Sequence, residues 1–160
     1  MRSTPHLDAL RLKAQSVGLL LLRLGAGGLI WAYHMHPKLT HFEEELSSFP
    51  DPMGIGHAPS FFLALLSEGV CSLLVAAGLG ARLFSLPIVF TMLMVLVVAV
   101  QGFEGADVQA ALLYALPYAA ITLCGPGRFS LDHVLRSRFA KLSSEIERRL
   151  APASPALTNE

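Results

Sequence analysis

The fold is decided by one uncharged stretch of the chain, LFSLPIVFTMLMVLVVAVQGF, at residues 83–103. It is bounded by Arg82 and Glu104 and contains 21 residues without an ionisable side chain. A helix rises about 1.5 Å per residue, so about 20 apolar residues cross the roughly 30 Å hydrocarbon core of a bilayer. The stretch therefore predicts a membrane-spanning helix, which we place at residues 83–101.

Three further stretches have the length and apolar character of a span. Residues 108–127 carry no charge, whereas 16–36 contain Arg23 and 60–80 contain Glu68. Proline and glycine residues lie in the connections and at the ends of these stretches, as expected for turns. The sequence thus predicts an all-α protein in which four transmembrane helices form a bundle, with spans at 16–36, 60–80, 83–101 and 107–124.

The composition supports a membrane protein and excludes several other classes. Of the 160 residues 53% are hydrophobic and 15% are charged, and the mean hydropathy is +0.54. Soluble domains carry about 25% charged residues. The 12 basic and 12 acidic side chains balance, so no nucleic-acid partner is expected. Cys71 and Cys124 lie far apart, so neither a zinc knuckle nor a thioredoxin-type dithiol is indicated.

The distribution of Lys and Arg predicts the direction of insertion. Ten of the twelve lie in the N-terminal segment 1–15, at Arg82 or after residue 127, and the first connection has only Lys38. Cytoplasmic loops carry the excess of Lys and Arg. Both termini are therefore expected in the cytoplasm, with the chain in a bacterial-type inner membrane. A cleaved signal peptide is the competing interpretation of residues 16–36, but that stretch is long and lacks a small-x-small cleavage site.

Residues 128–150 are predicted to form an amphipathic helix at the membrane surface rather than a fifth span. Ser130 can cap this helix, and basic residues surround an apolar stripe along it. Such a helix is expected to lie on the anionic cytoplasmic leaflet, and a partly disordered tail is the alternative beyond Lys141. Residues 151–160 are expected to be disordered. The stripe comprises Leu131, Leu135, Phe139, Leu142, Ile146 and Leu150.

The few ionisable residues inside the spans mark the candidate site. A charge near the bilayer centre costs about 2.5–3.5 kcal/mol on insertion scales, so Arg23 and Glu68 are expected to face the interior. Arg23 either pairs with Glu68 or extends toward the cytoplasmic interface. Glu68 is an ion-pair partner, a protonated acid, a proton relay or a structural hydrogen-bonding group. The predicted interior polar track consists of Arg23, His34, Lys38, Glu68, Tyr114 and Tyr118.

The order of these residues resembles the DoxX family of small four-helix membrane proteins. The likeness runs over about residues 17–135, and one departure is His34-Met35-His36-Pro37-Lys38, where the family usually has glycine after the first histidine. The resemblance implies a four-helix bundle and a link to membrane redox chemistry. Relatives include a membrane subunit of thiosulfate:quinone oxidoreductase and partners of oxidative-stress systems. The matching pieces are Leu20-Leu-Leu-Arg-Leu-Gly25, His34-x-x-x-Lys38, Glu68-Gly69, Gly78-Leu-Gly-Ala-Arg82, Leu112-Leu-Tyr114 and Gly125-Pro-Gly-Arg-Phe-Ser-Leu-Asp132.

Three functions fit these features. The first is a quinone-linked or redox-associated subunit of a membrane oxidoreductase or oxidative-stress complex. A redox role would need a partner protein or an exchangeable quinone, because the chain has no haem, iron–sulfur or Rossmann motif. The second is handling of copper or another transition metal at the outer face by loop histidines and methionines, with Met35 and Met53 as the nearby methionines. The third is an assembly subunit, with a protein partner or as a homo-oligomer, in which the intramembrane charges only fix packing. The candidate metal ligands are His34, His36, His41 and His57.

The metal hypothesis carries a geometric condition. His34 and His36 lie two residues apart, so on a continuous helix their side chains point in nearly opposite directions. They can bind one ion only if the helix ends before them, and Pro37 favours such an end because the residue before proline avoids the helical region. The path of the backbone at Pro37 therefore decides whether these two histidines can act together.

Overall fold

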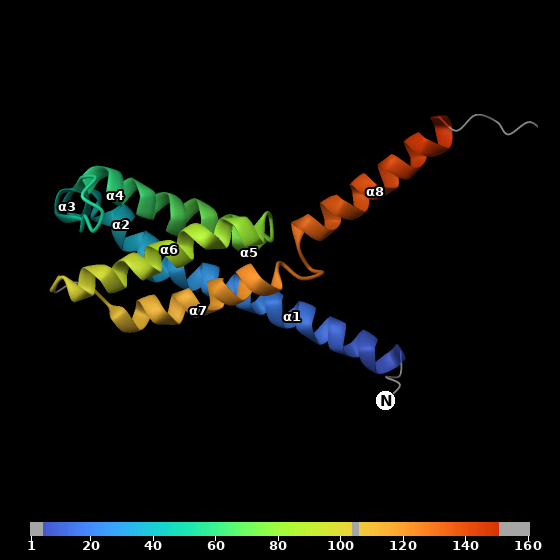
Figure 1. The fold of residues 1–160 in the computed structure, drawn as a ribbon, viewed down its shortest axis with the longest axis horizontal. Helices are drawn as coiled ribbons and strands as arrows, with labels where there is room; N and C mark the ends of the chain where they lie inside the picture. The colour runs from blue at the N-terminus through green and yellow to red at the C-terminus, as the bar shows by residue number, and fades with distance from the viewer. Residues whose placement is uncertain (1–4, 104–105, 151–160) are drawn as a thin grey trace, which may run out of the picture.

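The computed structural model describes residues 5–103 and 106–150, and every regular element in these residues is a helix (Figure 1). The prediction of an all-α protein is confirmed for this part of the chain. By length and composition, three helices can cross a membrane, and a fourth apolar helix is shorter. The elements that pack together are α1 (Pro5–Ile30), α2 (His36–Thr40), α3 (Phe42–Ser48), α4 (His57–Ala64), α5 (Ser72–Ala77), α6 (Ala81–Val100) and α7 (Val108–Cys124).

The first helix runs without a break from α1 into α2 and is longer at both ends than the predicted span 16–36. It begins at Pro5, a residue favoured in the first turn because its missing N–H needs no partner there. It also continues through Pro37 to Thr40. The turn before the proline, Trp31–Met35, is a π-helix, and this wider turn accommodates a ring that would clash with a regular α-helix. The helix therefore does not end between His34 and His36.

The second helix contains a π-helical turn of its own, Leu65–Cys71, between α4 and α5. It ends at Ala77, before the expected Gly80, in a Schellman motif. Gly78 adopts a left-handed φ of 76°, its N–H donates to the Val75 carbonyl at 2.9 Å, and the Leu79 N–H donates to the Leu74 carbonyl at 2.9 Å. This turn leads directly into α6.

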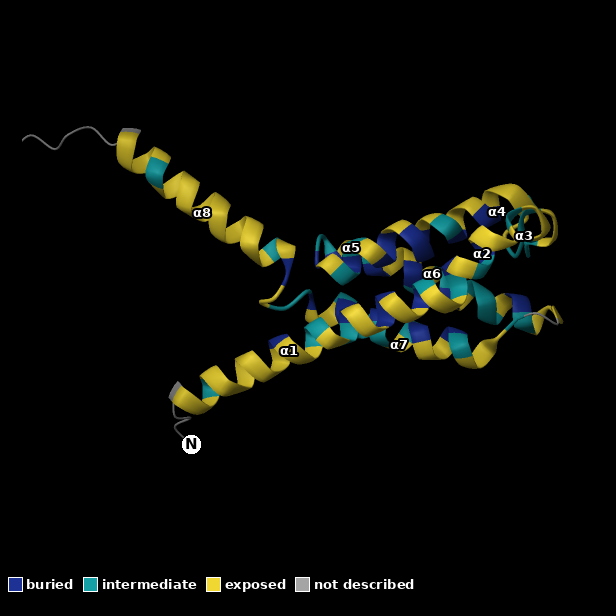
Figure 2. Cartoon of the chain, turned by 180° about the vertical axis from the view of Figure 1, so that it is seen from behind, coloured by how far each residue is buried: buried dark blue, intermediate teal, exposed yellow. Residues whose placement is uncertain are grey.

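Helices α6 and α7 pack along each other, α6 also packs against the second helix, and α7 packs against α1. Asp107 caps α7, because its carboxylate accepts the Ala110 N–H at 2.9 Å. The buried faces meet in a common core, while the outward faces carry exposed apolar side chains such as Leu83 and Leu123 (Figure 2). This arrangement suits lipid on the outside. The fully buried apolar residues are Ile30, Phe61, Val75, Ala81, Ile88, Met92, Tyr118 and Ile121.

Helix α8 (Leu131–Leu150) leaves the packed helices obliquely and is exposed along almost its whole length (Figures 1 and 2). The Ser130 hydroxyl accepts the His133 N–H at 3.2 Å, as expected for a helix cap. The prediction of a disordered tail at 151–160 falls outside the described residues.

Candidate functional site

The two π-helical turns face each other in the packed structure. The Trp31 indole N–H of the first turn donates to the Gly69 carbonyl of the second at 3.2 Å. A π-helical turn widens the helix by one residue and often marks a functional position. Here the two turns carry His34 and Glu68, so the irregular backbone of both helices coincides with the polar residues of the spans.

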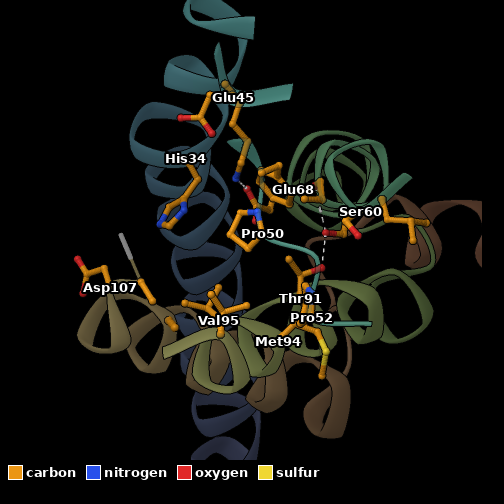
Figure 3. Close-up of a pocket in the computed structure, with 18 of the residues that line it drawn as sticks. His34, Glu45, Pro50, Pro52, Ser60, Glu68, Thr91, Met94, Val95 and Asp107 are labelled. Carbon is orange, nitrogen blue, oxygen red and sulfur yellow. Dashed lines mark hydrogen bonds and ion pairs between the residues drawn. The ribbon is translucent and has the colours of Figure 1, made fainter. Parts of the chain in front are cut away.

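A cavity of about 910 Å³ lies beside these turns (Figure 3). The first helix, α3, the second helix, α6 and the residues around Asp107 enclose it. Its walls are largely apolar, whereas the polar side chains at its edge include His41, Glu44, Glu45 and Asp107. The apolar lining includes Leu63, Leu66, Phe90, Met94, Val95 and Val98.

An ion pair between Lys38 and Glu68 lies in the wall of this cavity. The Lys38 Nζ donates to Glu68 Oε2, and the two residues are only 8% and 2% exposed. The Phe49 ring centroid lies 5.8 Å from Nζ, within cation–π range. The ammonium reaches this depth because α2 continues past Pro37 and keeps Lys38 on the inner face of the helix.

Arg23 does not pair with Glu68, so that part of the prediction is wrong. Its guanidinium donates to the Phe129 carbonyl and, at 3.5 Å each, to the carbonyls of Val75 and Ala76. These last two are at the carboxyl end of the second helix, where the helix dipole attracts a cation. Arg23 is fully buried, and these contacts direct its guanidinium toward the end of the helices at which α5 meets α6 and α8 begins.

The surroundings of Arg23 form a second polar cluster, which we call the arginine hub: Arg23, Gly78, Gly80, Phe129 and Asp132. The Asp132 carboxylate accepts the Gly80 N–H at 3.0 and 3.1 Å, and the Asp132 N–H donates to the Gly78 carbonyl at 3.1 Å. A methyl group added at Gly78 would collide with the guanidinium of Arg23. The hub therefore joins α1, the turn after α5 and the start of α8.

The tyrosines of the predicted track lie on α7. The His34 ring is half-buried and meets Tyr114 edge to face, with centroids 4.8 Å apart. Tyr118 is fully buried, and its hydroxyl has no hydrogen-bond partner among the described residues. The predicted track thus divides in two: His34 and Tyr114 meet near the Lys38–Glu68 pair, whereas Arg23 belongs to the hub.

The four candidate metal-binding histidines do not converge. His36 is exposed on the helix, whereas His34 is half-buried beside the cavity, as the unbroken helix requires. His41 lies 3.9 Å from the Glu44 carboxylate, and the His57 Nδ1 contacts the Phe49 carbonyl. Within residues 5–103 and 106–150, no three or more His, Cys, Asp or Glu side chains are placed to hold one metal ion.

Sequence reasoning did not identify the hydroxyl pair of the cavity wall or the loop that closes it. The hydroxyls of Ser67 and Thr91 lie 2.7 Å apart and join the second helix to α6. Asp51 holds the loop, because its carboxylate accepts from the Gly56 N–H at 2.7 Å, the Ile55 N–H at 3.0 Å and the Ser60 hydroxyl at 2.9 Å. The hydrogen bond from the Gly56 N–H is the main reason that the pKa of Asp51 lies below its ordinary value. Asp51 follows Pro50 and precedes Gly54, a common turn pattern that could have indicated this role.

Comparison with known proteins gives one match. The model of the DoxX family matches residues 18–101, a range that includes Arg23, His34, Lys38 and Glu68 and stops before α7. No curated protein and no solved structure matches the chain. The family match covers more than half of the sequence and contains Lys38, Glu68 and Arg23, whereas Phe129 and Asp132 of the hub lie beyond it.

Proposed function

The chain belongs to the DoxX family, and from this premise we propose that it is a quinone-binding subunit of a membrane oxidoreductase. Its apolar helices make it an integral membrane protein. The observation that carries the proposal is the buried Lys38–Glu68 pair in the wall of a largely apolar cavity. Such a cavity offers a hydrogen-bonding end and a hydrophobic body, which are the two parts of a membrane quinone.

The proposed topology has four spans and both termini in the cytoplasm. Arg82 and Arg128 lie at the end of the helices where α5 meets α6 and α7 leads to α8. Glu43–Glu45 and Asp107 lie at the opposite end. The positive-inside rule favours the basic end in the cytoplasm, so the cavity would open near the outer face of a bacterial-type inner membrane.

The size and walls of the cavity fit a quinone head. Ligand pockets usually have volumes of about 300–1,000 Å³ and mostly apolar walls, and this cavity has about 910 Å³. Three of its lining residues, Leu63, Leu66 and Phe90, are about half exposed, so this side of the cavity is not covered by other parts of the described chain. An isoprenoid tail could therefore extend from the cavity into the bilayer between the second helix and α6.

The polar groups of the cavity would hold the quinone oxygens. An ammonium has three N–H donors, and Glu68 accepts one of those of Lys38. The remaining donors can bind a carbonyl oxygen of the head, and the half-buried His34 ring offers a second polar contact. A bound quinone would supply the electron-accepting chemistry, while a protein partner would supply the electrons.

Extraction of quinones from the purified protein tests this function. We expect ubiquinone or menaquinone to copurify with the wild-type chain and with Glu43→Gln, because Glu43 is exposed and does not line the cavity. Glu68→Gln should lose most of the quinone. Absence of quinone from all three proteins, with no effect of added quinone on thermal unfolding, would remove the proposal.

An assembly role is the second candidate, because Lys38 and Glu68 also satisfy each other in the bilayer. Replacing a buried ion pair by apolar residues of similar size is often neutral or stabilising. If Lys38→Met/Glu68→Met keeps the fold, the copurifying polypeptides and the quinone content, the pair is structural and the assembly role is favoured. Loss of quinone with retention of the partner favours the quinone site.

A further inference from the structure

We propose that α8 is a peripheral membrane anchor that binds anionic lipid headgroups on the side of the bilayer where Arg82 and Arg128 lie. The proposal concerns a surface remote from the cavity and does not depend on quinone binding. It rests on the exposed apolar stripe of α8, on the arginine hub that fixes the start of this helix, and on the basic residues beside the stripe.

The apolar stripe of α8 is exposed in the folded chain. Its side chains recur at helical spacing on one face, and each is more than 40% exposed, with Phe139 at 66%. A helix that remains uncovered along such a stripe, with polar residues on its other face, is typical of helices that lie in the membrane interface. The stripe residues with a described exposure are Leu131, Leu135, Phe139, Leu142 and Ile146, and the exposed Val134 borders them.

The arginine hub fixes the beginning of α8 at the end of the spans. Asp132, in the first turn, exchanges hydrogen bonds with Gly78 and Gly80, and Arg23 holds the carbonyl of Phe129. Only residues 125–130 separate α7 from α8. Leu123 and Phe129, near the two ends of this connection, are exposed apolar residues like those of the stripe. The hub therefore holds the start of the stripe at the end of the spans.

The charges of α8 favour anionic lipid over another occupant. The helix has five basic residues and three acidic ones. Of the acidic ones, Asp132 is engaged in the hub and Glu145 pairs with Arg148 and Arg149. On a helical wheel Arg136 and Lys141 lie on opposite borders of the stripe, where their ammonium and guanidinium groups can reach lipid phosphates. Each basic residue near an anionic leaflet contributes about 1 kcal/mol of attraction.

Two cysteine variants on opposite faces of α8 test this placement in the full chain. Leu142 lies at the centre of the stripe and Ser144 on the opposite face, and both are exposed. Leu142→Cys and Ser144→Cys are made in a Cys71→Ala/Cys124→Ala background and labelled with bimane. The proteins are placed in nanodiscs of phosphatidylcholine, with or without phosphatidylglycerol, that contain an acyl-chain nitroxide quencher.

We expect the label at position 142 to be quenched several-fold more than the label at 144 in discs with phosphatidylglycerol. High salt, or the triple change Arg136→Gln/Arg138→Gln/Lys141→Gln, should abolish this difference. Equal quenching at the two positions overturns the proposal, as does quenching that is independent of phosphatidylglycerol. A label at 142 that is shielded from water without being quenched by lipid also overturns it, because a protein surface would then cover the stripe.

Discussion

The cavity and the arginine hub both bury a cation inside the membrane domain, but they provide it with different partners. Lys38 meets a carboxylate in the wall of a cavity of about 910 Å³, whereas Arg23 meets backbone carbonyls among closely packed glycines. The carboxylate can change its protonation or its partner when a ligand enters, but carbonyls at a helix end have no such freedom. This difference supports the proposal that a ligand binds in the cavity and that the hub holds the helices together.

The largest expected effect comes from removing one partner of the cavity pair. Lys38→Met leaves the Glu68 carboxylate buried without a counter-charge, which costs about 3–5 kcal/mol of unfolding free energy. Lys38→Met/Glu68→Met removes both charges and should return to within about 1.5 kcal/mol of the wild type. Denaturant titration of the purified protein in detergent measures both values. Equal losses for the single and double variants would mean that the two side chains are not coupled.

Removing the cation of the hub should destabilise the protein without weakening quinone binding. Arg23→Met removes the donors to three carbonyls, and hydrogen bonds of a charged group contribute about 1.5–3 kcal/mol, so a loss of about 2–3 kcal/mol is expected. Arg138→Met, an exposed position on α8, is the control and should change stability little. Thermal unfolding with and without a short-chain quinone gives both readouts. If added quinone no longer raises the unfolding temperature of Arg23→Met, the hub also takes part in ligand binding, and the two regions do not have separate roles.

A smaller effect is expected when the glycine that approaches the guanidinium is replaced. Gly78 has a φ of 76° and no room for a methyl group, so Gly78→Ala should destabilise the fold by at least about 1–2 kcal/mol. Gly28→Ala is the matched control, because Gly28 is helical and has open space around its Cα. There alanine should stabilise by about 0.5–1 kcal/mol. The same denaturant titration measures both variants. If both substitutions stabilised the protein, or both destabilised it, the result would contradict the tight packing around Gly78.

The smallest effect concerns pH and the loop that borders the cavity. The folded structure lowers the pKa of Asp51, so the carboxylate stabilises the loop above its unfolded pKa of about 3.9. That contribution is lost as the pH falls through the lower folded value. Hydrogen exchange should therefore show faster opening of the Ile55 and Gly56 amides in strongly acidic buffer, and in Asp51→Asn at neutral pH. Unchanged exchange of both amides in Asp51→Asn would show that the carboxylate does not hold the loop.

The apolar helices could be predicted from the sequence because their signal is local. Uncharged stretches such as 83–103 determine the helix class without reference to any other part of the chain. The ends were less predictable: the first helix begins at Pro5 instead of Ser16 and continues past Pro37. The continuation depends on a π-helical turn before the proline, which hydropathy and proline rules do not reveal.

In the candidate site, the sequence indicated which residues lie in the interior but not which of them form the ion pair. Arg23, Lys38 and Glu68 were all expected to face the interior, but Arg23 was the cation considered as the ion-pair partner of Glu68. Arg23 and Glu68 both lie inside predicted spans, whereas Lys38 lies two residues beyond the predicted end at residue 36. Two further helical residues place Lys38 beside Glu68. The carbonyls that hold Arg23 could not be predicted, because Phe129 lies 106 residues away and backbone carbonyls leave no sequence pattern.

The most direct test of the central claim is the thermal shift caused by a short-chain ubiquinone in three proteins: wild type, Lys38→Met/Glu68→Met and Arg23→Met. We expect a concentration-dependent rise in the unfolding temperature for wild type and Arg23→Met, and none for the double variant. A full shift in the double variant, or a shift lost only in Arg23→Met, would contradict the assignment of the ligand site to the Lys38–Glu68 cavity.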